Sequence, residues 1–172
     1  MFAVRSAVFI AKSQLDLREG VTDGHWNNVQ KYSQQLPAFR WTNGQPWCLV
    51  FVQWCLWQIG VEVPEGARSA SCRVSCQAFK KAERFTEYPV TGAVVFYGVG
   101  GRAHAGLCTG WDNTHVYTVE GNTNTDGSPE GNGVYARKRV RRDDYVHGYG
   151  LPYYPHDKAI SPGPWSGKSL AR

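Results

Sequence analysis

The sequence has no apolar run long enough to cross a membrane. Its first 20 residues, MFAVRSAVFIAKSQLDLREG, contain a short apolar stretch that is not followed by an A-x-A-like cleavage site. A membrane helix needs about 20 consecutive apolar residues, and a secretory signal peptide needs a cleavage site with small residues. We therefore expect no membrane partner and no signal peptide, and we predict a first helix over residues 5–19 that ends at Gly20.

The sequence also lacks the cysteine spacings of metal sites. Its five cysteines are Cys48, Cys55, Cys72, Cys76 and Cys108, and no two of them form a C-x-x-C pair. Cys72 and Cys76 have helical spacing, but no second pair accompanies them, which argues against a structural zinc site. Because five is an odd number, at least one thiol stays free in a monomer, which suits a reducing compartment. We expect no metal and no cofactor.

Nucleic-acid binding has little beyond net charge to support it. The net charge of +5 would attract any polyanion, either nucleic acid or an anionic cell wall. The lysines and arginines are dispersed, and no nucleic-acid fold signature is present. The one basic run, ARKRVRR, is typical of a solvated strand face. Nucleic acid is therefore the weakest of the possible partners.

The order of local patterns predicts the fold class. Helical patterns come first, over residues 5–19, 25–36, 47–59 and 69–83, with Ser69 or Ser71 as the cap of the last one. After Tyr88, short runs rich in Val, Tyr and Phe predict antiparallel strands over 92–98, 103–111, 115–123, 133–140 and 145–154. Helices followed by strands predict one α+β domain over residues 1–154. The Pro-, Gly- and Ser-rich residues 155–172 predict a tail.

The densest apolar stretch, residues 45–60, contains two cysteines with different settings. Pro46 favours a helix start and Gly60 a helix end, and the residues between them are apolar nearly all round. Cys55 lies in the middle of this helix, where a core role is expected. Cys48 lies in its first turn, where free N–H groups and the helix dipole favour thiolate. Position alone leaves Cys48 open as either a buried hydrophobe or a nucleophile.

A cysteine nucleophile needs a base, which is usually a histidine oriented by a third group. His104 is flanked by small residues in RAHAGL, which leave space for a substrate or another chain. Glu120 and Asn122 on the following strand are two residues apart and so share a face. A buried Glu120 would be costly unless it bonded to a partner such as the imidazole. The alternative interpretation of Glu120 and Asn122 is a polar strand end that leads into a loop.

The register of the hairpin that joins these strands distinguishes the two interpretations. A three-residue turn at 111–113 pairs Gly110 with Thr114 and places His104 opposite Glu120. A two-residue turn places the two side chains on opposite faces of the sheet. The catalytic interpretation therefore predicts either an odd loop or a β-bulge in this hairpin.

Several segments, in this order, resemble the CHAP domains, the cysteine- and histidine-dependent amidohydrolase/peptidases common in bacteriophage lysins. The segments are PWCLVFVQW, GAVVFYG, HAGL and EGNTN, followed by GNGVYARKR and VHGYGLP. The resemblance covers roughly residues 10–153. It implies a papain-like α+β fold, in which a central helix that begins at the catalytic cysteine packs on a C-terminal antiparallel sheet carrying the histidine.

The resemblance also implies roles for individual residues. Cys48 would be the nucleophile, His104 the base, Glu120 the group that orients the imidazole, and Asn122 an auxiliary polar group. Gln45 and Trp47 would contribute to substrate or oxyanion binding. Some relatives bind calcium through an acidic loop before the cysteine, but RWTNGQPW contains no Asp or Glu, so no such site is expected.

The function that the resemblance implies is peptidoglycan hydrolysis through a thioester. The bond would be the amide between muramic acid and L-alanine, or one within the peptide stem or cross-bridge. We expect a monomer that is made in the host cytoplasm and reaches the bacterial wall with the help of a holin or after lysis. The alternatives from other classes are a non-enzymatic cell-wall-binding module and a virion-associated structural component.

Overall fold

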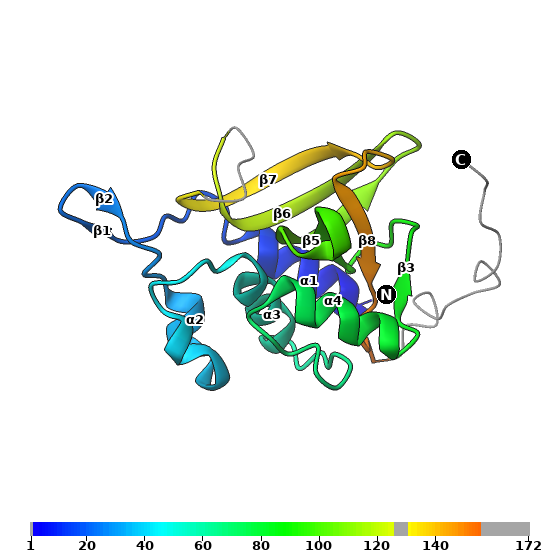
Figure 1. Cartoon of the computed structure of the whole chain (residues 1–172), viewed down its shortest axis with the longest axis horizontal. Coiled ribbons are helices and arrows are strands. Elements are labelled where there is room, and N and C mark those ends of the chain that lie inside the picture. The colour runs from blue at the N-terminus through cyan, green and yellow to red at the C-terminus, as the bar shows by residue number, and fades with distance from the viewer. Residues whose placement is uncertain (1, 126–130, 156–172) are drawn as a thin grey trace.

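A six-stranded antiparallel sheet forms one layer of the molecule, and helices α1, α3 and α4 lie on one side of it (Figure 1). The computed structural model describes residues 2–125 and 131–155. The strand order is β3-β8-β4-β5-β6-β7. Its strands are β3 (Phe85–Thr86), β4 (Val94–Tyr97), β5 (His104–Trp111), β6 (His115–Thr123), β7 (Gly133–Val140) and β8 (Val146–Gly150). The combination of helices and an antiparallel sheet is compatible with the predicted α+β class.

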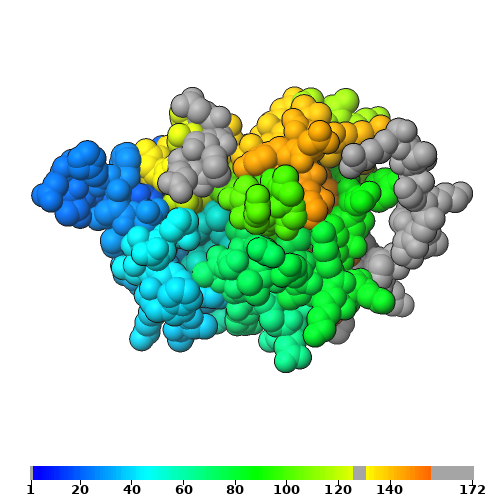
Figure 2. Space-filling model, in the orientation of Figure 1, coloured from blue at the N-terminus to red at the C-terminus, as the bar shows by residue number. Residues whose placement is uncertain are grey.

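The remaining elements come mostly from the N-terminal half. The helices are α1 (Phe2–Lys12), α2 (Lys31–Gln35), α3 (Cys48–Trp57) and α4 (Cys72–Lys81), with 3₁₀ turns η1 (Pro37–Thr42) and η2 (Val99–Gly101). A short hairpin of β1 (Val21–Thr22) and β2 (His25–Trp26) projects from the body of the molecule (Figure 2). Among the helices of the described ranges, none has both the length and the apolar character of a membrane span.

Helix α3 is the centre of the core, as its apolar sequence predicts. Every residue from Cys48 to Leu56 is buried, and the helix packs against both β5 and β6. Gly121 of β6 makes this approach possible, since a Cβ there would lie 2.5 Å from the Trp47 ring and 2.8 Å from Phe51. Full burial of a side chain such as Phe51 stabilises the fold by about 1.5–3 kcal/mol. The helix start is thereby held against the strand that carries Glu120.

The predicted strands and the last two helices are confirmed with small shifts at their ends. Strands β4 to β8 lie within the five predicted runs, and α3 and α4 lie within residues 47–59 and 69–83. Of the two candidate caps, Ser71 is the N-cap of α4, and its hydroxyl accepts a hydrogen bond from the Val74 N–H. The short strand β3 was not predicted. The predicted tail lies outside the described residues from position 156 onward.

The first predicted helix, residues 5–19, is wrong at its C-terminal end. Helix α1 ends at Lys12, and Asp16 adopts a left-handed φ of 66°. The backbone of the next segment pairs with β7 instead: the Asp16 N–H donates to the Val134 carbonyl, and the Val134 N–H donates to the Leu17 carbonyl. Tertiary pairing with a distant strand therefore overrides the local helical pattern.

The second predicted helix, residues 25–36, is also mostly wrong. Only Lys31–Gln35 is helical, because Asn28 has a left-handed φ of 58° and the Gln30 side chain caps the helix by accepting from the Ser33 N–H. His25 and Trp26 pair with Val21–Thr22 across a tight turn. The 3₁₀ turn η1 follows α2 directly, with Pro37 at its first position.

Candidate active site

Cys48 is the first residue of α3, as the position of Pro46 predicts. Its neighbour Trp47 occupies the N-cap position but contributes no side-chain cap. The thiol therefore lies in the first turn, where backbone N–H groups lack partners within the helix and the dipole favours negative charge. Cys48 is 7% exposed, so it is nearly but not completely covered.

His104 begins β5 and is completely buried beside an acidic partner. Its Nε2 lies 3.0 Å from the Oε2 of Glu120, and both side chains are 0% exposed. The other carboxylate oxygen of Glu120 accepts hydrogen bonds from the Tyr97 hydroxyl at 2.8 Å and from the Thr118 hydroxyl at 2.6 Å. Glu120 is thus satisfied by several donors, and it fixes the orientation of the imidazole.

Arg139 of β7 completes the group around Glu120 and was not predicted from the sequence. Its Nε donates to Oε1 at 2.9 Å and its terminal nitrogen donates to Oε2 at 2.6 Å, in the bidentate geometry that guanidinium favours. The run ARKRVRR predicted a solvated strand face for most of its residues, and Arg139, whose side chain is only 15% exposed, is an exception. The register pairs Arg139 with Val116, which lies on the same face of β6 as Glu120.

The hairpin between β5 and β6 contains the predicted bulge. The Asp112 N–H donates to the His115 carbonyl at 2.9 Å, which closes a tight turn rather than the odd loop considered first. The register then shifts between Cys108 and Gly110, which leaves Thr109 as the extra residue. A two-residue turn without a bulge would place His104 and Glu120 on opposite faces of the sheet. The shift by one residue brings both side chains to the same face.

The specific pairing of His104 with Glu120 as directly opposed residues is wrong, however. Beyond the bulge Leu107 pairs with Val119, so Glu120 lies across from Gly106. A Cβ at Gly106 would lie 2.6 Å from the Glu120 Cγ, so the carboxylate side chain passes over the glycine to reach the imidazole. The contact is a diagonal one between neighbouring strands. Gly106, two residues after His104, thus accommodates the Glu120 side chain, which belongs to another strand.

Cys48 and His104 shift each other's pKa in opposite directions. The hydrogen bond from the Cys72 thiol, whose sulfur lies 3.7 Å away, lowers the pKa of Cys48; burial raises it, and the His104 charge lowers it again. The pKa of Cys48 is therefore well below its ordinary value. Burial lowers the pKa of His104, but the Cys48 thiolate and the Glu120 carboxylate raise it to about 9. The favoured state is thiolate beside imidazolium.

The imidazole has one nitrogen left for proton transfer. Glu120 engages Nε2, whereas the buried Nδ1 has no hydrogen-bond partner within the described residues. Burial would raise the pKa of Glu120, but hydrogen bonds from Arg139 and His104 hold it well below its ordinary range. Glu120 therefore stays ionised near neutral pH and stabilises the protonated form of His104.

We expect alkylation of Cys48 by iodoacetamide to remain fast at pH 6. An ordinary thiol has a pKa of about 8.5 and is mostly protonated there, whereas the lowered pKa of Cys48 keeps it ionised. His104→Ala removes the positive charge and should shift the labelling midpoint upward. The pH dependence of labelling, followed by mass spectrometry of the Cys48 peptide, checks both results. Cys55, whose pKa is raised by burial, is the internal control for slow labelling.

Asn122 lies beyond the His104–Glu120 pair, at the irregular end of β6. It is buried, has a left-handed φ of 53°, and sits where the register with β7 shifts between Glu120 and Thr123. Asn122 lines a polar hollow of about 320 Å³. The other residues that line this hollow are Glu19, Trp26, Asn28, Asn124, Gly131 and Asn132. The bulge therefore changes the simple same-face relation with Glu120 that the sequence predicted.

The structure gives Trp47 and Gln45 different positions. The Trp47 indole is buried, stacks on Tyr32, and donates its N–H to Glu19 at 2.8 Å. That N–H is therefore already used, which conflicts with an oxyanion-binding role for the Trp47 side chain. Gln45 is exposed in the turn before α3, and its backbone N–H donates to the Thr42 carbonyl.

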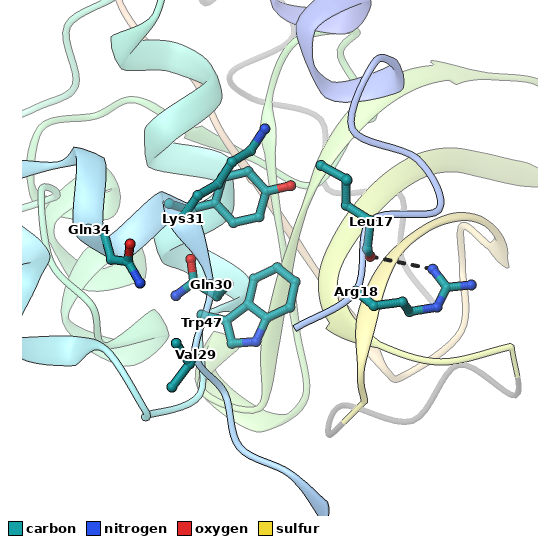
Figure 3. A pocket seen from close by; sticks show the side chains of 8 residues that line it. Leu17, Arg18, Val29, Gln30, Lys31, Gln34 and Trp47 are labelled. Atoms are coloured by element: carbon teal, nitrogen blue, oxygen red, sulfur yellow. Dashed lines mark hydrogen bonds between the residues drawn. The ribbon is translucent and has the colours of Figure 1, made fainter. Parts of the chain in front are cut away.

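A second hollow, of about 250 Å³, lies between residues 29–34 and the Leu17–Arg18 segment, with Trp47 as part of its wall (Figure 3). The Arg18 side chain extends away from the indole and donates to the Leu17 carbonyl at 3.4 Å. Aliphatic, aromatic, amide and basic side chains all line the hollow. Neither Cys48 nor His104 is among the residues that line it.

The buried group suits acyl transfer: Cys48 offers a thiolate, His104 a proton, and Glu120 with Arg139 a fixed charge behind the imidazole. Within residues 2–125 and 131–155, no cluster of three or more His, Cys, Asp or Glu side chains is placed to hold a metal ion.

The sequence matches no family model, and searches of the curated proteins and of the solved structures find no significant match.

Proposed function

We propose that this protein is a cysteine amidohydrolase or peptidase with a papain-like arrangement, which hydrolyses an amide bond of bacterial peptidoglycan in the manner of CHAP domains. One observation supports this most strongly. The Cys48 thiol, in the first turn of α3, interacts with His104, whose Nε2 is hydrogen-bonded to the ionised carboxylate of Glu120. A core cysteine needs no such partners, whereas a nucleophile does.

The reaction begins with attack by the Cys48 thiolate on the carbonyl carbon of the amide. A C–S bond forms, and the carbonyl electron pair moves onto oxygen, where the free N–H groups at the start of α3 stabilise the charge. His104 then gives its proton to the amide nitrogen, the C–N bond breaks and the amine leaves. Water, deprotonated by His104, hydrolyses the thioester and returns the thiolate.

Glu120 and Arg139 hold the His104 imidazole in place while it acts first as a general acid and then as a general base. Glu120 holds the ring so that Nδ1 exchanges the proton, and the positive charge that develops on His104 is balanced by the carboxylate. Arg139 keeps that carboxylate ionised and in place. Glu120 and Arg139 are therefore positioning residues, while Cys48 and His104 contact the reacting atoms.

Peptidoglycan as the substrate is supported by charge and by the family resemblance of the motifs. The net charge of +5 favours approach to an anionic wall. The order of the segments around Cys48, His104 and Glu120 resembles that of wall-cleaving CHAP domains. We propose that the protein acts at the bacterial cell wall.

Incubation of the full chain with purified peptidoglycan should release fragments that carry new amine ends. Mass spectrometry of the soluble products identifies the bond, either muramoyl–L-alanine or one within the stem or cross-bridge. Protein alkylated at Cys48 is the control and should release none. A protein that pellets with the walls but creates no new ends would instead be a non-enzymatic binding module or structural component, and the proposal would fail.

A further inference from the structure

The nucleophile candidate is in contact with a second thiol. The sulfur atoms of Cys48 and Cys72 lie 3.7 Å apart, and neither residue is in a disulfide. Each is the first residue of a helix, Cys48 of α3 and Cys72 of α4. The two helix starts therefore bring together sulfurs that are 24 residues apart in the chain.

The two thiols differ in their ionisation. The hydrogen bond to Cys48, burial and the negative charge of the neighbouring thiolate raise the pKa of Cys72 well above its ordinary value, so Cys72 stays protonated and donates to Cys48. Both side chains keep a little exposure, 7% for Cys48 and 6% for Cys72, so a small oxidant can reach them after minor movement. A thiolate with a protonated thiol against it is the arrangement in which an oxidised sulfur is captured by its neighbour.

We propose that Cys48 and Cys72 form a reversible modification site, in which a peroxide oxidises Cys48 and Cys72 resolves the product as a disulfide. The formation of the disulfide depends only on the geometry of the two thiols. Its effect on activity rests on the proposed function, because the disulfide removes the nucleophile. The two helix starts are then joined by a covalent bond.

The chemistry balances in two steps. The Cys48 thiolate attacks one peroxide oxygen, the O–O bond breaks, and hydroxide leaves, so that sulfur becomes a sulfenic acid and the peroxide is reduced. Cys72 attacks this sulfur and gives up its proton, the S–O bond breaks, and water leaves as the S–S bond forms. An external dithiol reverses the process and is itself oxidised to a disulfide.

Only a small movement of the two side chains is needed to form the disulfide. The sulfurs must approach from 3.7 Å to the S–S bond length of about 2.05 Å. Rotation about the Cα–Cβ bonds of two residues in first helical turns can supply such an approach. Cys72→Ser keeps a similar shape and a hydrogen-bonding group but cannot form the S–S bond. Cys76→Ser is the matched control, because Cys76 lies one turn further along α4.

The experiment treats the reduced full chain with one equivalent of hydrogen peroxide and maps the peptides without reduction. Trypsin isolates Cys72 in residues 69–73, and we expect this peptide linked to residues 41–68, which contain Cys48 and Cys55. The linked peptide should be absent from Cys48→Ala and Cys72→Ser, and present in Cys76→Ser. Dithiothreitol should restore iodoacetamide labelling of Cys48 in the wild type.

In Cys72→Ser treated with several equivalents of peroxide, a second peroxide should oxidise the sulfenic acid of Cys48 to sulfinic acid, and dithiothreitol should restore about tenfold less labelling than in the wild type treated in the same way. Sulfinic acid at Cys48 of the wild type without the linked peptide would overturn the proposal, as would a linkage that survives in Cys48→Ala. If the linked peptide forms but the reduced chain releases no wall fragments, the modification site stands and the proposed function fails.

Discussion

Cys48→Ala is expected to lower the rate of wall cleavage by on the order of 10⁴- to 10⁶-fold, because the reaction loses the atom that forms the thioester. The fold should be retained. Alanine is a strong helix former, and removal of one sulfur at the start of α3 costs about 1 kcal/mol. Turbidity loss of a cell-wall suspension measures the rate, and circular dichroism with thermal unfolding measures the fold.

Cys55→Ala is the matched control for this variant. The same atom is removed from the same helix, but Cys55 is 0% exposed in the core and its pKa is raised by burial. We expect it to lose stability by roughly 1–2 kcal/mol while cleaving walls at a rate near that of the wild type. Undiminished turbidity loss by Cys48→Ala would show that Cys48 is a core residue, and the enzymatic proposal would have to be abandoned.

The parts of the fold that could be predicted are those whose pattern is local and strong. Helix α3 is apolar throughout, α4 has Ser71 as its N-cap, and the later strands are separated by glycine, asparagine and aspartate. The failures lie where a distant partner decides. Residues after Lys12 have a helical pattern, yet Arg18 pairs with Gly133, more than a hundred residues later in the chain. No local signal reports such a contact.

In the candidate site, too, residues with a local signal were predicted, and residues placed by distant contacts were missed. Cys48 follows from a helix start, and the joint placement of His104 and Glu120 follows from strand periodicity once a bulge is allowed. Arg139 was missed because its neighbours in sequence are exposed, and only the cross-strand register separates it from them. Cys72 was missed because its contact with Cys48 joins two helix starts through the packing of α4. Alternation along β7 was the signal that could have indicated Arg139.

Substitution of Glu120, which forms a buried ion pair with Arg139, is expected to lower both the stability and the cleavage rate strongly. Glu120→Gln keeps the shape of the side chain but leaves the Arg139 guanidinium, which is 15% exposed, without its counter-charge. Removal of one partner of a buried ion pair destabilises a protein by about 3–5 kcal/mol. The rate of cleavage should fall by on the order of 10²- to 10⁴-fold, because the imidazole loses its orientation and its counter-charge. Urea unfolding and wall-cleavage rates measure the two effects.

The pH dependence of stability and of the cleavage rate shows which effects of Glu120→Gln come from the loss of the negative charge. In the wild type the folded pKa of Glu120 is depressed, so its stabilising contribution is present above its unfolded pKa of about 4.3 and is lost as the pH falls below that value. Glu120→Gln should lack this acid-dependent loss. The pKa of His104, about 9 in the wild type, should fall in the variant, since the carboxylate no longer stabilises the imidazolium. The alkaline limb of the cleavage profile should therefore move to lower pH.

The double variant Glu120→Gln with Arg139→Met distinguishes a positioning role from a purely structural one. Removal of both charges should recover much of the stability lost in Glu120→Gln, because no unpaired guanidinium remains in a mostly buried position. The cleavage rate should not recover with it, since His104 still lacks a carboxylate at Nε2. If stability and rate recovered together, Glu120 and Arg139 would serve only to hold β6 and β7 in place, and the thiolate–imidazolium pair would not depend on them.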